Sequence, residues 1–225
     1  MDGILVYYER TDNCGKEVMP MNASNRPANP ESLEMAKKRD KKVYITDVAI
    51  DKVPLIEYYG FTDEQNRIMQ ELARNVLVIS KESNDSNEVA LTCDLGKPDP
   101  LHNFGVALGT EHDVDVLSDT LSNHMIVSSK SVAVVLLHNH PSTQTFSLED
   151  VQFFVQHPML AVIVVVSNQG TVHYMKRDKD FDYDKVVVLF KECIQGLKRN
   201  SPGTEVYMAT LTFLAKCSEA GLYYR

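Results

Sequence analysis

The sequence predicts an α/β (α+β) protein built around a mixed β-sheet that is flanked by helices. Of its 225 residues, 44% are hydrophobic, which is enough apolar material for a core. Two fully apolar runs of strand length, residues 132–137 and 160–166, indicate strands that are buried on both faces. From residue 88 the predicted order is strand, strand, helix, strand, helix, strand, strand, which combines hairpins with helical crossovers.

Residues 1–80 are predicted to be an N-terminal extension of unknown role. Asn29 is followed by proline and glutamate, a pattern typical of a helix start, so a short helix is expected there. Residues 43–53 are rich in β-branched side chains and are expected to be extended. Thr62 and Gln65 have capping-box spacing and start a longer helix. One face of that helix is apolar at helical spacing, at Ile68, Leu72, Val76 and Ile79.

The central part, residues 81–180, contains the predicted sheet, and residues 181–225 are predicted to be helices that pack on it. Gly221 follows the last helix and suits a C-terminal stop. The predicted strands cover residues 88–95, 104–108, 132–137, 160–166 and 171–175. The predicted helices cover residues 114–129, 147–156, 183–198 and 204–220.

Charge and cysteine spacing restrict the class of protein. The formal net charge of -8 opposes binding to phosphate backbones, which argues against a nucleic-acid partner. The basic residues between 37 and 42 are interpreted as a solvated helix end. No run approaches the ~20 apolar residues of a membrane span, and we find no secretion signal. The four cysteines form no CxxC pair, so we expect free thiols in a cytoplasmic protein without membrane association.

The residues that indicate chemistry follow the apolar run 132–137. His138 and His140 are two positions apart at the end of this predicted strand, so their side chains point to the same face. Pro141 ends the strand. Asp150 falls in the first turn of the next predicted helix, from which its side chain can return to the strand end. Two imidazoles and one carboxylate are therefore expected to meet.

These three side chains form a candidate metal site. Zinc accepts nitrogen and oxygen ligands, and three protein ligands leave a fourth position for water. Zinc also lowers the pKa of that water to ~7. We therefore expect one Zn²⁺ per chain, although iron, nickel and manganese accept the same ligands. The structural alternative is a pair of surface histidines at a strand end, next to an ordinary helix cap.

The pattern His138-x-His140-Pro141 followed by Ser147-x-x-Asp150 resembles the metal-binding signature of JAB/JAMM (MPN+) metalloproteases. The His-Asn-His-Pro-Ser form is especially similar to the RadC-like bacterial branch. The likeness covers residues from about 88 to 176. It implies a JAB/MPN-like (cytidine-deaminase-like) core, in which residues 81–180 are the metal-binding domain. The loop before Ser147 is one residue shorter than the family pattern, which affects substrate contacts more than the metal site.

The resemblance also implies catalytic roles. Ser147 would hydrogen-bond near the metal-bound water or the oxyanion, although its role as the helix N-cap competes with this. A glutamate in an early strand would be the general base, and Glu88 at the start of the first predicted strand fits that place. Glu111, in a predicted loop, is the alternative. The implied activity is zinc-dependent hydrolysis of amide or isopeptide bonds. A protein or peptide substrate such as a ubiquitin-like tail is expected, and a peptidoglycan-type amide or a small conjugate is also open.

Two other functions stay open at this point. A non-catalytic scaffold could use the metal for structure alone. A DNA-associated role is the second, because RadC-like proteins are tied by name to DNA repair, but the acidic balance argues against tight nonspecific binding. Loss of activity on chelation without unfolding would distinguish an enzyme from a scaffold. Salt-dependent binding to labelled DNA would support the DNA-associated role.

Overall fold

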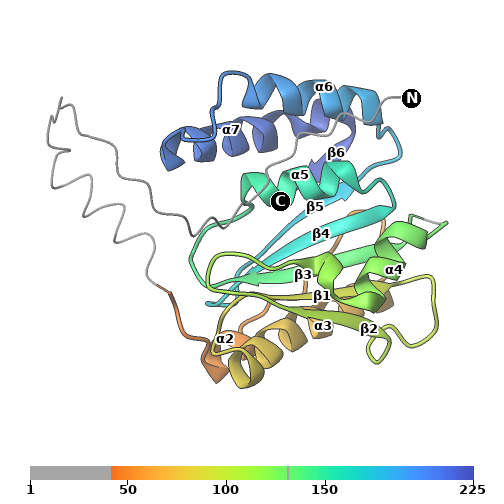
Figure 1. The fold of residues 1–225 in the computed structure, drawn as a ribbon. Coiled ribbons are helices and arrows are strands. Elements are labelled where there is room, and N and C mark those ends of the chain that lie inside the picture. The colour runs from red at the N-terminus through yellow and green to blue at the C-terminus, as the bar shows by residue number, and fades with distance from the viewer. Residues whose placement is uncertain (1–41, 131) are drawn as a thin grey trace, which may run out of the picture.

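The centre of the protein is a six-stranded mixed sheet between layers of helices (Figure 1). A computed structural model describes residues 42–130 and 132–225, and the helix predicted after Asn29 lies outside them. The strands are β1 (Val89–Asp94), β2 (Phe104–Leu108), β3 (Val134–His140), β4 (Leu160–Ser167), β5 (Val172–Arg177) and β6 (Leu222–Tyr224). Their order is β2-β1-β3-β4-β5-β6, in which β3 and β4 are parallel and the other pairs antiparallel. The predicted fold class is therefore confirmed at the level of a mixed sheet flanked by helices.

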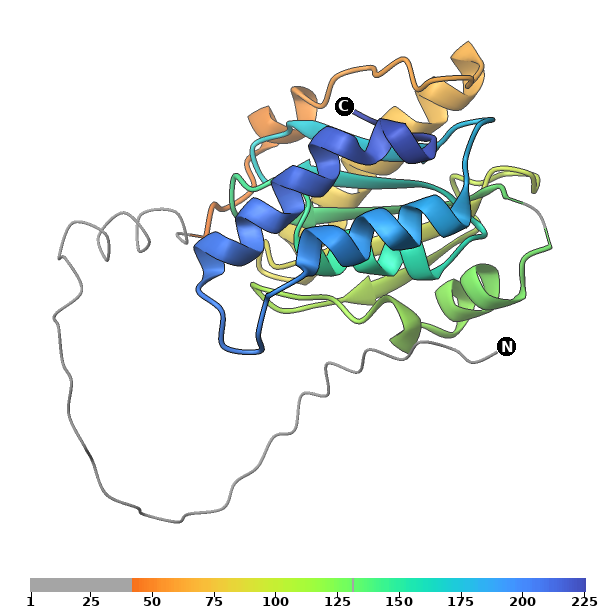
Figure 2. The same cartoon turned by 90° about the horizontal axis from the view of Figure 1, so that it is seen from above.

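Helices lie on both faces of this sheet (Figures 1 and 2). One face carries α2 (Asp47–Asp51) and α3 (Asp63–Ser83), and the other carries α4 (Thr120–Ser128), α5 (Leu148–Gln156), α6 (Tyr183–Ile194) and α7 (Gly203–Lys216). Because strand side chains alternate, β3 contributes to both cores. Val135 and Leu137 pack in the core with α3, whereas Val134 and Leu136 pack in the core with α5, α6 and α7.

Helix α3 begins at the predicted capping box. Thr62 Oγ1 accepts a hydrogen bond from the Gln65 N–H at 3.2 Å, and Gln65 Oε1 accepts one from the Thr62 N–H at 3.0 Å. Leu72 and Val76, from the predicted apolar face, are fully buried in the core between α3 and the sheet. Although α3 falls within the predicted N-terminal extension, it packs directly on the sheet. The division of the chain into three parts stays a prediction.

The prediction that residues 43–53 are extended is wrong for α2. The Thr46 side chain accepts a hydrogen bond from the Ala49 N–H at 3.2 Å, and Asp47 follows in the first turn. A capping oxygen and an acidic residue both stabilise a helix start. This local cap outweighs the β-branched composition of the run.

The single helix predicted over residues 114–129 is also wrong, because a short 3₁₀-helix, η1 (Val116–Ser118), precedes α4. Asp119 has an extended backbone, and its carboxylate accepts a hydrogen bond from the Ser122 N–H at 2.7 Å. Asp119 therefore caps a new helix instead of continuing the first one. At the chain end, a second 3₁₀-helix, η2 (Cys217–Ala220), and the unpredicted β6 follow α7.

Within residues 42–130 and 132–225, no helix combines the length and apolar character needed to cross a membrane. Cys93, Cys193 and Cys217 are free thiols, as the spacing predicts for them.

Arg177, at the end of β5, is buried and holds the C-terminal end of α5. Its Nε donates to the Leu160 carbonyl at 2.7 Å, and its Nη2 donates to the carbonyls of Phe154 at 2.6 Å and His157 at 3.0 Å. The guanidinium lies 4.4 Å from the ring centroid of Phe154 and 4.3 Å from that of Phe181. Burial lowers the pKa of Arg177 to about 10. Carbonyls at the end of a helix lack partners within the helix, so Arg177 fixes this end of α5 on the sheet.

We expect Arg177→Met to lower the free energy of unfolding by about 3 kcal/mol, because buried carbonyls lose their donors while the apolar volume is kept. Urea denaturation at neutral pH measures this loss. The control is Lys179→Met at an exposed position nearby, which should change the free energy of unfolding by less than about 0.5 kcal/mol. Equal losses in the two variants would contradict this role of Arg177.

Candidate metal centre

His138 and His140 are the last alternate residues of β3 on the face that packs against α5. Val134 and Leu136 precede them on the same face and belong to the apolar core. The exposed fractions of His138 and His140 are 3% and 7%. Both imidazoles are therefore buried, which contradicts the alternative of a surface histidine pair.

The first turn of α5 supplies the third side chain of the site. Ser147 Oγ accepts a hydrogen bond from the Asp150 N–H at 3.0 Å, and Asp150 Oδ2 accepts one from the Ser147 N–H at 2.7 Å. These two bonds form a capping box. They hold the Asp150 carboxylate at the helix N-terminus, where the helix dipole also favours a negative charge.

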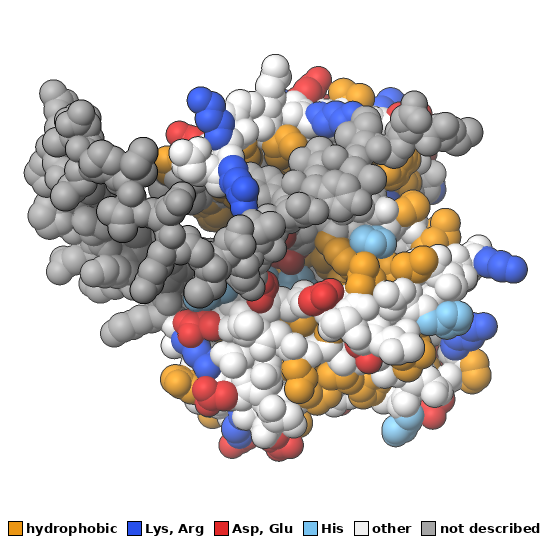
Figure 3. Space-filling model, viewed as in Figure 1, with side chains coloured by type: hydrophobic (Ala, Val, Ile, Leu, Met, Phe, Trp, Pro, Cys, Tyr) orange, Lys and Arg blue, Asp and Glu red, His pale blue; other side chains and the backbone are white. Residues whose placement is uncertain are grey.

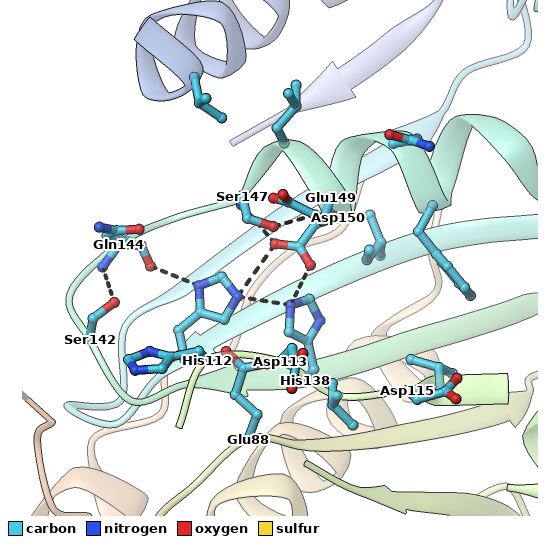
Figure 4. Close-up of a pocket in the computed structure, with 18 of the residues that line it drawn as sticks. Glu88, His112, Asp113, Asp115, His138, Ser142, Gln144, Ser147, Glu149 and Asp150 are labelled. Atoms are coloured by element: carbon cyan, nitrogen blue, oxygen red, sulfur yellow. Dashed lines mark hydrogen bonds and ion pairs between the residues drawn. The ribbon is translucent and has the colours of Figure 1, made fainter. Parts of the chain in front are cut away.

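The three side chains converge on one point (Figure 4). His138 Nε2 lies 3.0 Å from His140 Nε2 and 3.1 Å from Asp150 Oδ1. His140 Nε2 lies 3.4 Å from Asp150 Oδ2. Each of the three residues offers one ligand atom, and these atoms lie within 4.8 Å of one another. They form a candidate metal-binding triad.

The triad has the spacing and the chemistry of a metal site. Ligand atoms at about 2.0–2.1 Å from a tetrahedral zinc ion lie about 3.3 Å from each other, and the distances from His138 Nε2 to His140 Nε2 and to Asp150 Oδ1 are close to this value. His140 Nε2 is nearest to the second carboxylate oxygen, Oδ2. His140 Nδ1 lies 3.3 Å from the Gln144 carbonyl oxygen, which can only accept a hydrogen bond. A proton on Nδ1 leaves the lone pair on Nε2, the atom that faces the other two ligands. The residues present therefore fit a bound divalent cation.

The charges within the triad stabilise one another. Burial raises the pKa of Asp150, but the charges and hydrogen bonds of His138 and His140 outweigh it and hold this pKa well below its ordinary value. Burial lowers the pKa of His140, but the hydrogen bond and charge of Asp150, with the charge of Glu88, raise it to about 9. An ionised carboxylate at this depth requires positive charge beside it, which protonated histidine or a metal ion supplies.

The triad opens into a cavity of about 1000 Å³ whose lining includes Glu88. Acidic and histidine side chains gather near the centre of the face that is shown in Figure 3. Glu88 directly precedes β1, is 8% exposed, and lies beside the two histidines in Figure 4. Burial raises the pKa of Glu88 to about 8; the charge of His140 opposes this shift, and the charges of Asp150 and Asp113 add to it. Glu88 is thus a buried carboxyl group that interacts with the triad.

The alternative base, Glu111, lines the same cavity from the loop between β2 and η1. The Glu88 N–H donates to the Thr110 carbonyl at 2.9 Å, so this loop stays beside the start of β1. Glu111 is half-buried, whereas Glu88 is buried. The lining also includes the basic residues Lys198 and Arg199 from the connection between α6 and α7, which no motif in the sequence links to the site.

Two buried asparagines beside the triad are further residues that the sequence analysis does not identify. Asn139 stands between the two histidines and Asn168 directly follows β4. They are 0% and 1% exposed, and Asn139 Nδ2 donates to Asn168 Oδ1 at 2.7 Å. An amide at a strand position that faces an apolar core can indicate a buried hydrogen-bonded residue in the sequence, because burying an unpaired amide is costly. Its partners, however, are distant in sequence.

No protein-family model matches the chain, and comparisons with curated proteins and with solved structures find no match.

Proposed function

We propose that this protein is a zinc-dependent hydrolase of amide or isopeptide bonds, of the JAB metalloprotease type. The observation that carries the proposal is the convergence of His138, His140 and Asp150, whose ligand atoms lie within 4.8 Å of one another, inside a cavity that also contains the buried carboxyl group of Glu88. Zinc is the metal of choice because two imidazoles and one carboxylate match its preferred ligands. A bound zinc ion supplies Lewis acidity, which activates water and polarises a carbonyl group.

Glu88 is the proposed general base. It takes a proton from the attacking water and passes this proton to the amine that leaves when the C–N bond breaks. A buried carboxyl group whose pKa is raised to about 8 can accept and release a proton near neutral pH. Its place in the cavity, with electrostatic interaction to His140 and Asp150, supports this role over that of the half-buried Glu111.

Ser147 is proposed to stabilise the negative charge that develops on the carbonyl oxygen. The helix cap uses the Ser147 hydroxyl oxygen as an acceptor, with the Asp150 N–H as donor. A hydroxyl group also has one hydrogen to donate, so the cap and the catalytic role can operate together. Ser147 lines the same cavity as the triad, which supports this assignment.

The cavity is large enough to accept a peptide segment. Its volume of about 1000 Å³ lies at the upper end of the range for small-ligand sites. The lining combines carboxylates, Lys198 and Arg199 with apolar side chains such as Leu148 and Phe153. A peptide segment offers both polar backbone and apolar side chains to such a wall.

Metal content tests this proposal first. Protein purified without added metal is expected to contain about one zinc per chain by mass spectrometry, and His138→Ala/His140→Ala is expected to contain none. The matched control is His102→Ala/His124→Ala, which removes two exposed histidines and should keep the zinc. The same proteins are incubated with mixtures of peptides and lysine-isopeptides, and the products are identified by mass spectrometry.

Zinc and hydrolysis in the wild type and in the control, both lost in the triad variant, would support the hydrolase. Bound zinc without cleavage of any amide or isopeptide would favour a non-catalytic scaffold. The proposal is wrong if neither the wild type nor the triad variant binds a metal.

A further inference from the structure

Asn139 lies on the face of β3 opposite to the two histidines that flank it. His138 and His140 point toward α5, so Asn139 points toward α3, where Leu137 precedes it in the core. The Asn139 side chain is fully buried. It cannot touch a substrate in the cavity, and any functional effect must pass through the backbone that it binds.

The amide group of Asn139 binds the backbone on both sides of Glu88. Its Oδ1 accepts a hydrogen bond from the Val89 N–H at 2.8 Å, and its Nδ2 donates to the Asn87 carbonyl at 3.1 Å. Glu88 is therefore the residue between two backbone groups that are fixed by one side chain. Asn139 is the residue between the two histidines of the candidate metal site in β3, so its side chain connects the strand of the metal ligands to the residues on both sides of Glu88.

Further hydrogen bonds fix the Asn139 side chain. Ser80 of α3 donates its hydroxyl hydrogen to the Asn87 carbonyl at 2.6 Å and lies 3.2 Å from Asn139 Nδ2. Asn168 accepts from Asn139, and its own Nδ2 donates to the carbonyls of Val43 at 2.6 Å and Ser86 at 2.9 Å. The amide orientation of Asn139 is thus determined by acceptors on one side and a backbone donor on the other.

We propose that Asn139 is a positioning residue that sets the place of the Glu88 carboxylate relative to His138 and His140. The inference rests on the proposed function, since Glu88 matters only if it moves protons in the cavity. The start of β1 also bonds to the loop at Thr110, and β1 pairs with β3 from Ala90 onward, opposite His138. The bonds from Asn139 extend the connection with the ligand strand to the two residues that flank Glu88. A displacement of about 1 Å in a reacting group can lower a rate by about 100-fold.

The test is a double-mutant cycle between Asn139 and Glu88. Asn139→Leu removes the amide without adding charge, and Asn139→Asp keeps the acceptor for Val89 while it removes both donors, in case the leucine variant does not fold. Asn66→Leu and Asn66→Asp are the matched controls, because Asn66 is a buried asparagine that accepts a hydrogen bond from the Tyr58 N–H at 3.1 Å elsewhere in the fold. We expect kcat to fall about 100-fold in the Asn139 variants with little change in KM. In a Glu88→Gln background, the same substitutions should cost less than about twofold.

A second readout does not need activity. Each protein is loaded with Co²⁺, and its visible absorption is followed against pH. We expect the pH midpoint of the absorption change to shift in Asn139→Leu and in Glu88→Gln. The variant that combines the two substitutions should show no additional shift. Both Asn66 variants should keep the wild-type midpoint. The Co²⁺ affinity of the Asn139 variants, measured by chelator competition, should stay within about threefold of the wild type, less than the loss expected from an altered ligand shell.

The outcomes separate the two proposals. If the wild type takes up no Co²⁺, the metal site fails and the role of Asn139 fails with it. If the wild type binds Co²⁺ but the Asn139 substitutions act equally with and without Glu88, Asn139 is a structural residue and only this inference is wrong. If the wild type binds Co²⁺ but does not hydrolyse the peptides offered, the absorption midpoints of the single and double variants alone test the role of Asn139.

Discussion

Glu88→Gln is expected to lower kcat for amide hydrolysis at least about 1000-fold while the protein keeps one zinc per chain. Glutamine is nearly isosteric with glutamate but cannot take up a proton from water. Glu88 is outside the triad, so its replacement leaves His138, His140 and Asp150 in place. Steady-state kinetics on the cleaved peptide, together with zinc analysis of the same sample, measures the effect.

Glu111→Gln is the informative comparison, because Glu111 is the other glutamate considered as the base and lines the same cavity. We expect this substitution to lower kcat less than about tenfold, since Glu111 is half-buried and Glu88 is the carboxyl group coupled to His140 and Asp150. Full activity in Glu88→Gln combined with an inactive Glu111→Gln would assign the base to Glu111. Loss of zinc in Glu88→Gln would instead make Glu88 part of the metal site.

The convergence of the triad could be predicted from the sequence because it depends on short-range rules. Alternation along a strand places His138 and His140 on one face, and a capping box between Ser147 and Asp150 fixes the carboxylate at the helix start. A loop of a few residues joins these two elements, so little chain entropy separates them. The same kind of rule explains the correct start of α3 at Thr62.

The surroundings of the triad could not be predicted, because they bring together distant parts of the chain. Asn139 binds residues near 88, and Asn168 binds the Val43 carbonyl at the start of the described chain. Lys198 and Arg199 lie at the cavity in a fold where α6 and α7 pack on α5, a helix distant from them in sequence. No local sequence pattern encodes such contacts. The wrong secondary-structure predictions for residues 43–53 and 114–129 have a local cause, because single capping residues there outweigh the composition or periodicity of the whole segment.

The metal-free protein is expected to lose stability as the pH rises from 6 to 9, by on the order of 6 kcal/mol. The pKa of His140 is raised from 6.5 to about 9 in the folded protein, so its contribution is complete below pH 6.5 and is lost as the pH rises through 9. The pKa of Glu88 is raised from 4.5 to about 8, so its contribution is complete below pH 4.5 and is lost as the pH rises through 8. Between pH 6.5 and 8 both groups act in the same direction. Asp150, whose pKa is lowered, loses its contribution only in acid.

Zinc should reverse this dependence, because a metal ion binds deprotonated imidazoles and competes with protons for them. The difference in Tm between zinc-loaded and chelator-treated protein is therefore expected to widen between pH 6 and pH 9, as thermal unfolding across this range would measure. In the metal-free state, the stability of Glu88→Gln should decline less with pH than that of the wild type, because one of the two titrating groups is gone. His140→Gln should likewise remove the contribution of the other group. A metal-free protein whose stability is level from pH 6 to 9 would mean that neither group is held in its protonated form by the fold. Metal binding would then not have to displace a proton from His140 between pH 6.5 and 9.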